Sequence, residues 1–106
     1  MLEEKRKKID GAVLDIPGFG KVRLKTGYYF GTNRLAILVD CVDDGEPYGV
    51  LTVNIPRADL ATGEILVKTW SENEALSEAA RKCGLFADTG RREQTGFVYA
   101  EYWGVL

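Results

Sequence analysis

The segment around Trp70 has the residue types of a ligand- or partner-binding corner. Residues 68–74 (KTWSENE) join an expected strand to an expected helix, and the free N–H groups at the start of a helix favour an anion. Trp70, Asn73 and Glu74 would then lie at an exposed corner and be available for recognition. In the alternative interpretation, Ser71 and Glu74 form a capping box that satisfies those N–H groups, and Trp70 belongs to the core.

A second group of this kind is a pair of arginines within residues 88–96 (DTGRREQTG), which we expect to form a loop because it contains two glycines. Arg91 and Arg92 could clamp a carboxylate or a phosphate through bidentate hydrogen bonds. The alternation of charge with Glu93 favours a solvated loop over such a clamp. If this loop folds back beside the start of the helix, the two segments form one anion site, but the sequence alone does not place them together.

The composition argues against catalysis and against a metal centre. The chain has no histidine, which is the commonest general base and metal ligand. Two cysteines, Cys41 and Cys83, are too few for a tetrahedral thiolate zinc site, and we expect both to be buried thiols in a reducing compartment. The carboxylates within residues 40–46 do not have the spacing of a calcium-binding loop. We therefore expect a protein that is not an enzyme and has no cofactor or metal.

The elements that must position these residues are mostly strands. Apolar and alternating runs, separated by glycine- and proline-containing turns, predict strands at residues 12–16, 20–30, 35–42, 48–55, 64–70 and 97–103. One amphipathic helix is expected over about residues 72–83. This order predicts an α+β fold with a mainly antiparallel sheet of five to six strands and the helix packed on one face. Residues 11–106 would form this single domain.

Charge is distributed unevenly along the chain. The first eight residues hold four basic and two acidic side chains, whereas the rest holds ten basic and fourteen acidic ones, and the net charge is −2. We expect residues 1–10 to be a basic, frayed N-terminal arm. A mildly acidic body disfavours nucleic-acid binding. The sequence has no apolar run of membrane-spanning length, so we expect a cytosolic protein with no membrane contact.

Several short motifs, read in order, resemble those of a known protein family. They are LTVNIP at residues 51–56, VKTWSENE at residues 67–74, GLF at residues 84–86, DTGR at residues 88–91 and TGFV at residues 95–98. The pattern covers roughly residues 20–106 and resembles a family of small accessory proteins of unknown function carried by bacteriophages, plasmids and integrative elements. The resemblance implies a mobile-element accessory protein, and many such proteins act by binding host or defence proteins.

We therefore expect a non-enzymatic protein that binds a host or defence-system protein and inhibits a defence such as CRISPR interference. The residues expected to contact the partner or ligand are Tyr48, Trp70, Asn73, Glu74, Arg91 and Arg92. The alternative is a protein that binds a small ligand or a nucleotide through the helix N-terminus and the Arg91–Arg92 loop. An edge strand of the expected sheet would also allow a homodimer to form by sheet extension.

Overall fold

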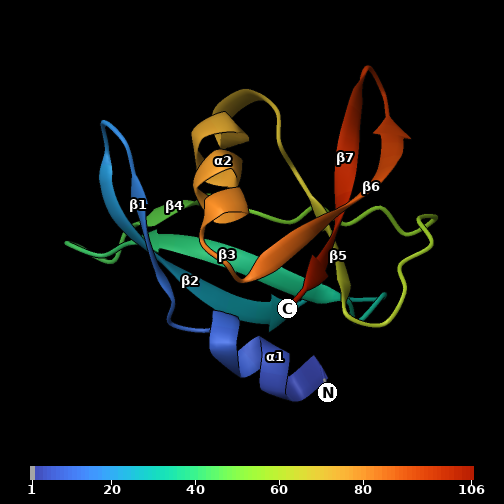
Figure 1. Ribbon diagram of the computed structural model, residues 1–106, viewed down its shortest axis with the longest axis horizontal. Helices are drawn as coiled ribbons and strands as arrows, with labels where there is room; N and C mark the ends of the chain where they lie inside the picture. Colours follow the sequence, from blue (N-terminus) through green and yellow to red (C-terminus); the bar gives the residue numbers. More distant parts are fainter. Residues whose placement is uncertain (1) are drawn as a thin grey trace.

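The computed structural model describes residues 2–106 and confirms the α+β class (Figure 1). Its elements in chain order are α1 (Leu2–Ile9), β1 (Val13–Ile16), β2 (Gly20–Tyr28), β3 (Leu35–Cys41), β4 (Pro47–Val50), β5 (Glu64–Val67), the 3-10 turn η1 (Ser71–Asn73), α2 (Glu74–Lys82), β6 (Phe86–Thr95) and β7 (Val98–Val105).

The strands form two antiparallel sheets rather than the single sheet expected from the sequence. The first has the order β1-β2-β3-β4 and the second has the order β5-β7-β6. Residues 51–53 connect the two sheets. The N–H of Leu51 donates to the carbonyl of Ile37 in β3 at 2.9 Å, and the N–H of Val53 donates to the carbonyl of Leu66 in β5 at 3.1 Å. The seven strands are therefore joined into one curved array that runs from β1 to β6.

Helix α2 covers the inner face of this array. It lies between β1 at one end and the β6–β7 hairpin at the other, and it packs against both β1 and β6 (Figure 1). Leu76 and Ala80 of α2 are fully buried against inward-facing residues of the first sheet, such as Leu24 and Ile37. The four-residue spacing of Leu76 and Ala80 places both on one side of the helix. The core of the protein thus lies between α2 and the curved array.

The N-terminal residues form a docked helix where a frayed arm was expected. Ile9, at the end of α1, is completely buried in the main core. Arg6 donates to the hydroxyl of Thr26 at 2.9 Å, and the carboxylate of Asp10 accepts the backbone N–H of Thr26 at 2.9 Å. The charge pattern predicted that this segment would be exposed to solvent. The buried Ile9 side chain and the two polar contacts with β2 instead hold the segment against the first sheet.

The segment expected to be a loop at residues 88–96 is mostly strand. It belongs to β6, which pairs with β7 through a two-residue turn at Gly96 and Phe97, where Gly96 supplies the positive φ of 62°. Gly90, at a φ of 85°, lies where the pairing register shifts between Asp88 and Arg92. A β-bulge accommodates the extra residues. Gly90 and the charged side chains, which suggested a loop, therefore lie within a bulged edge strand.

The expected helix at about residues 72–83 is confirmed in its main part, but its start differs. The turn η1 precedes α2, and neither begins with a side-chain capping hydrogen bond. Ser71 has a positive φ of 60°, so it is not the N-cap residue of a capping box. The predicted strand over residues 48–55 is also shorter, because β4 ends at Val50 and the following residues connect the two sheets.

Candidate functional site

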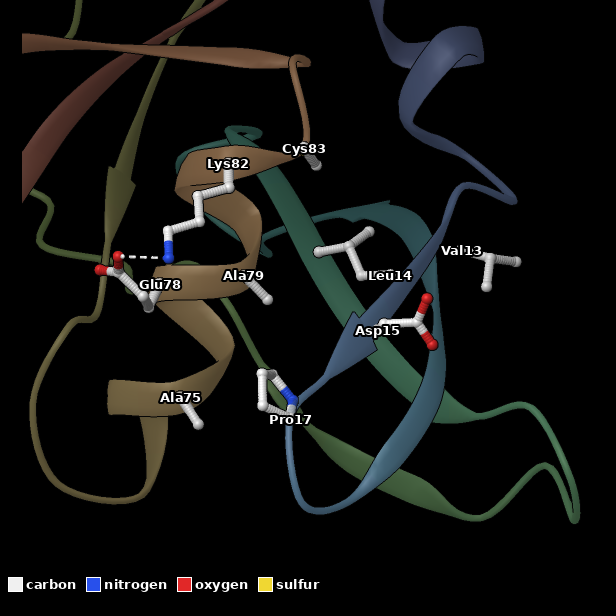
Figure 2. Close-up of a pocket in the computed structure, with 9 residues that line it drawn as sticks. All are labelled: Val13, Leu14, Asp15, Pro17, Ala75, Glu78, Ala79, Lys82 and Cys83. Atoms are coloured by element: carbon white, nitrogen blue, oxygen red, sulfur yellow. Dashed lines mark ion pairs between the residues drawn. The ribbon is translucent and has the colours of Figure 1, made fainter.

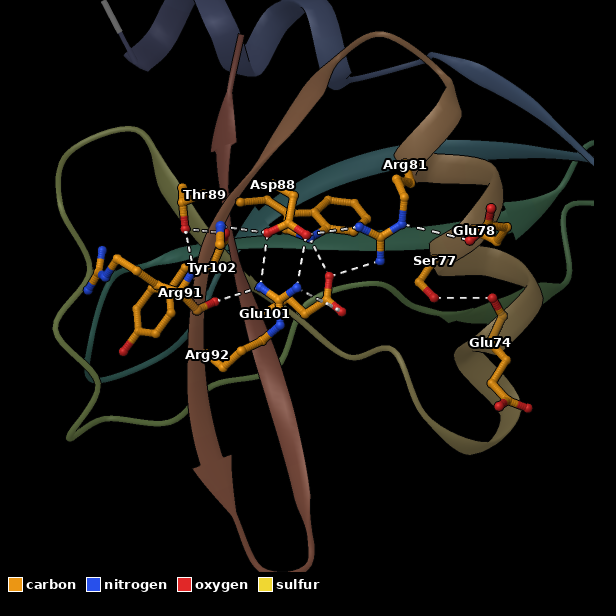
Figure 3. Close-up of polar contacts among 12 residues, drawn as sticks. Glu74, Ser77, Glu78, Arg81, Asp88, Thr89, Arg91, Arg92, Glu101 and Tyr102 are labelled. Carbon is orange, nitrogen blue, oxygen red and sulfur yellow. Dashed lines mark hydrogen bonds and ion pairs between the residues drawn. The ribbon is translucent and has the colours of Figure 1, made fainter.

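The two sides of helix α2 differ in how they meet the strands. On the β6 side, a polar network closes the contact (Figure 3). The guanidinium of Arg81 donates to Asp88 at 3.1 Å and to Glu101 at 2.9 Å. It also lies over the ring of Trp103, 5.1 Å from the ring centroid. This side of the helix therefore presents satisfied polar groups and a covered aromatic ring.

Arg92, expected to clamp a ligand, belongs to this network instead. Its guanidinium donates to the two carboxylate oxygens of Asp88 at 2.9 and 3.0 Å. These hydrogen bonds from Arg92, with further ones from Gly90 and Arg81, lower the pKa of Asp88 to about 2. Asp88 is ionised throughout the neutral range, so its pairing with Arg92 persists there.

Arg91 faces different neighbours from Arg92. Its guanidinium pairs with the carboxylate of Glu64 at 2.9 Å, donates to the carbonyl of Asp59 at 3.0 Å and lies 4.1 Å from the centre of the Tyr102 ring. The two arginines therefore do not converge on one ligand, and Figure 3 shows their side chains directed to separate partners. In this structure the expected arginine clamp beside the helix start is not formed, because intramolecular carboxylates pair with both guanidinium groups.

The residues predicted at the helix start also have separate roles. Asn73 is 2% exposed, and its side-chain amide donates to the carbonyls of Val50 at 2.7 Å and Lys68 at 3.2 Å. Trp70 is half-buried and packs on the smaller core cluster, with the Lys68 ammonium over its ring. Glu74 is exposed, and Figure 3 shows its carboxylate directed away from the polar network. Asn73 therefore does not lie at an exposed corner as predicted. Its buried amide holds β4 to the segment before α2 through these two hydrogen bonds.

Tyr48 lies at the surface beside this helix start. Together with Asn73 and Lys68 it lines a hollow of about 530 Å³. The ring of Tyr48 lies 4.6 Å from the ring of Phe19, whose side chain is 54% exposed. Phe19 comes from the turn between β1 and β2, so the aromatic pair joins this turn to β4. Tyr48 is the predicted contact residue that remains part of an accessible apolar surface.

The other side of α2 has an open groove toward β1 (Figure 2). The groove encloses about 450 Å³, and its lining residues are Val13, Leu14, Asp15, Pro17, Ala75, Glu78, Ala79, Lys82 and Cys83. The helix wall consists of the small side chains of Ala75, Ala79 and Cys83, which are spaced four residues apart. Pro17, two residues before Phe19, brings the groove close to the aromatic pair. We call the groove and this pair together the α2–β1 surface.

This groove was missed in the sequence because its residues resemble core residues. Ala79 and Cys83 follow the helical spacing of the buried stripe, and Cys83 was expected to be buried. Both cysteines are free thiols and half-buried. The available signal was a second stripe at Ala75, Ala79 and Cys83, directly beside the buried Leu76 and Ala80. Strand β1 does not cover the whole apolar face of α2, so the small residues of this second stripe remain accessible.

Three further findings bear on the site. Within residues 2–106, no group of three or more acidic or cysteine side chains is arranged to hold a metal ion. No helix in the same part of the chain is long and apolar enough to cross a membrane. No family model, curated protein or solved structure matches the chain.

Proposed function

We propose that the protein binds another protein through the α2–β1 surface and has no catalytic activity of its own. The observation that carries this proposal is the difference between the two sides of α2. The β6 side is closed by the ion pairs of Arg81, whereas the β1 side is an open groove with small apolar walls. A groove of this kind allows close approach of a partner chain, because alanine side chains project little from the helix.

The aromatic pair beside the groove supplies the anchor that protein interfaces commonly use. Tyrosine and other aromatic side chains carry much of the binding energy at interfaces, and burying one fully is worth roughly 1.5–3 kcal/mol. Phe19 is more than half exposed although its ring contacts Tyr48. The rim of the groove carries Glu78 and Lys82, 3.4 Å apart, which offer both signs of charge to orient a partner.

We infer from the motif resemblance that this is an accessory protein of a mobile genetic element in the bacterial cytoplasm. Its partner would then be a host or defence-system protein, and inhibition of a system such as CRISPR interference would be the biological outcome. The small size of the chain and the absence of histidine fit an inhibitor that acts by occupying a surface of its target. No nucleic acid is needed for this function.

The test compares proteins captured from a bacterial host lysate by tagged wild type and by two variants. Ala79→Arg fills the groove from a half-buried position, and Phe97→Ala removes a fully exposed aromatic ring at the distant β6–β7 turn. We expect a partner that is retained by wild type and by Phe97→Ala but lost by Ala79→Arg. The purified partner should bind Ala79→Arg at least about tenfold more weakly, a loss of about 1.4 kcal/mol.

The same variants connect binding to defence in a phage plating assay. A host that carries an active defence should become permissive with wild type and with Phe97→Ala, but not with Ala79→Arg. Thermal melts of all three proteins must first show that they fold. The proposal is refuted if folded Ala79→Arg captures the same proteins as wild type.

The alternative of a small-ligand protein is tested by thermal shift with a panel of nucleotides and other phosphate compounds. A ligand that binds only the native state raises the free energy of unfolding by RT ln(1 + [L]/Kd), where [L] is the free ligand concentration, and so raises the melting temperature. The hollow beside Tyr48 is the place to look for such a ligand, because Arg91 and Arg92 are paired elsewhere. Stabilisation by one compound that is abolished in Tyr48→Ala would favour this alternative over protein binding.

A further inference from the structure

Strand β1 is an end strand of the array, and its hydrogen-bond register determines which backbone groups are free. β1 pairs with β2 in the register Leu14 with Val22 and Asp15 with Lys21. The carbonyl of Lys21 accepts the N–H of Val42 on the other side of β2. In an antiparallel ladder the paired positions alternate. Leu14 and Ile16 therefore bond to β2, whereas Val13 and Asp15 direct their N–H and C=O groups away from it.

These free groups lie at the groove. Val13 and Asp15 both line it, and Figure 2 shows β1 beside helix α2 with Leu14 and Pro17 between them, whereas the side chains of Val13 and Asp15 point away from the helix. Within residues 2–106, no backbone hydrogen bond to another element is seen for the outward N–H and C=O groups of these two residues. Val13 is 47% exposed, so this edge is open to solvent. The groove thus combines an apolar helix wall with a strand edge that has two donors and two acceptors to satisfy.

We propose, on the basis of the protein-binding function above, that the groove takes an extended segment of the partner, which pairs with β1 as an added strand. Alternate side chains of an added strand would lie against Ala75 and Ala79, where there is room for them. Main-chain hydrogen bonds to Val13 and Asp15 would supply affinity, and the small-residue wall would select the side chains.

The ends of β1 limit the length of this segment. β1 has four residues, and Pro17 follows it without an N–H to donate. At the other end, Gly11 at a φ of 91° turns the chain into α1. The bound segment would therefore place about four or five residues along β1, a length of about 13–17 Å at the rise of an extended strand.

A second copy of this chain fits the edge less well than a partner segment. Pairing of β1 with its own copy about a twofold axis would bring both α2 helices to the same face of the extended sheet. Helix α2 already occupies the space next to β1 on that face. A linker or terminal segment, with no helix of its own packed beside it, meets no such obstacle.

The test uses a hexapeptide library displayed on phage, selected on immobilised wild-type protein. Enriched peptides are then measured by fluorescence anisotropy against Asp15→Pro, Asp15→Ala and Ala79→Arg. Proline and alanine both remove the exposed ion pair of Asp15 with Lys21, but only proline removes the outward N–H of residue 15. We expect peptides with alternating apolar residues that bind Asp15→Pro at least about tenfold more weakly than Asp15→Ala.

Amide hydrogen exchange followed by NMR gives an independent measurement on the same complexes. With a selected peptide bound to wild type, the amides of Val13 and Asp15 should exchange at least about tenfold more slowly, because they become hydrogen-bonded. The amides of residues on β6 should be unchanged. The NMR spectra also show whether Asp15→Pro keeps the native fold before its binding is compared.

The outcomes separate this inference from the proposed function. If peptides lose binding to Ala79→Arg but bind folded Asp15→Pro and Asp15→Ala equally, the groove binds protein but strand addition is refuted. If no peptide is enriched on wild type over Ala79→Arg, strand addition is refuted, and the lysate capture decides the function separately. If the two amides are protected without peptide in a concentration-dependent way, the occupant is a second copy, and the partner-segment inference is overturned.

Discussion

Replacing Asn73 with alanine should destabilise the fold rather than remove a binding contact. The side chain is 2% exposed and donates two hydrogen bonds, to the carbonyls of Val50 and Lys68. Each intramolecular hydrogen bond contributes about 1 kcal/mol net, so the loss of both is worth about 2 kcal/mol. Unfolding entropy near 60 °C is about 2.1 cal/mol/K per residue, which gives about 0.22 kcal/mol/K for a chain of this length. The melting temperature should therefore fall by about 9 °C.

The measurement is thermal and urea unfolding of Asn73→Ala, Asn73→Asp and the neighbouring control Glu74→Ala. Asn73→Asp should lose more stability than Asn73→Ala, because its carboxylate would face two carbonyl oxygens in a buried position. Glu74 is exposed, and its replacement should change stability by less than about 0.5 kcal/mol.

A different result would restore the interpretation of Asn73 as a recognition residue. That result would be a melting temperature of Asn73→Ala within about 2 °C of wild type, together with a loss of partner or ligand binding. It would show that the two hydrogen bonds of Asn73 do not hold β4 to the segment before α2.

Two further predictions concern α1 and the network beside β6. Ile9→Ala should cost about 3 kcal/mol in urea unfolding, because the side chain is completely buried; a loss below about 1 kcal/mol would show that α1 does not dock on the core. The pKa of Asp88 is about 2 in the folded protein, against an ordinary value of 3.8. The ionised carboxylate should therefore contribute its full stabilisation above about pH 4, and this stabilisation should be lost as the pH falls toward 2. The melting temperature of wild type should therefore exceed that of Asp88→Asn at pH 6 and converge on it near pH 2, and a difference that stays constant with pH would contradict the assignment.

The sequence predicted the class and most strands of this fold because those elements carry a local signal. The alternation of Val22 and Leu24 with basic residues in β2 is visible without any tertiary information, and so is the apolar run of β3. The helical stripe of Leu76 and Ala80 is equally local. Such patterns arise because one face of each element is buried, and the folded structure buries these same faces.

The elements that were missed depend on distant partners. α1 buries Ile9 in the core, and its residue Arg6 donates to Thr26 on β2. β6 exists because β7 pairs with it, and its charged residues Asp88 and Arg92 form ion pairs with Arg81 on α2 and Glu101 on β7. No window of sequence around residues 88–96 contains that information. Tertiary pairing overrode the local loop signal there.

The candidate site shows the same limit more sharply. Arg91 and Arg92 were predicted to bind a carboxylate or a phosphate of a ligand. Both do pair with carboxylates, but these belong to Glu64 and Asp88 of the same chain. Tyr48 was chosen as an exposed aromatic residue, and it lies on an accessible surface. The stripe of small residues on α2 was visible in the sequence, but the groove itself depends on how far α2 stands from β1, which the sequence does not show. Side-chain type indicates which interactions a residue can make, whereas the fold decides with whom it makes them.

The segment at residues 51–53 has a consequence for the order in which the protein assembles. It borders β3 on one side and β5 on the other, and both are encoded before residue 68. A chain growing from its N-terminus can therefore add β5 to the first sheet before β7, the second neighbour of β5, has been synthesised. The β6–β7 hairpin then docks last, with α2 already in place. Within that hairpin, β6 precedes β7, the strand with which it pairs, by only the short turn between them.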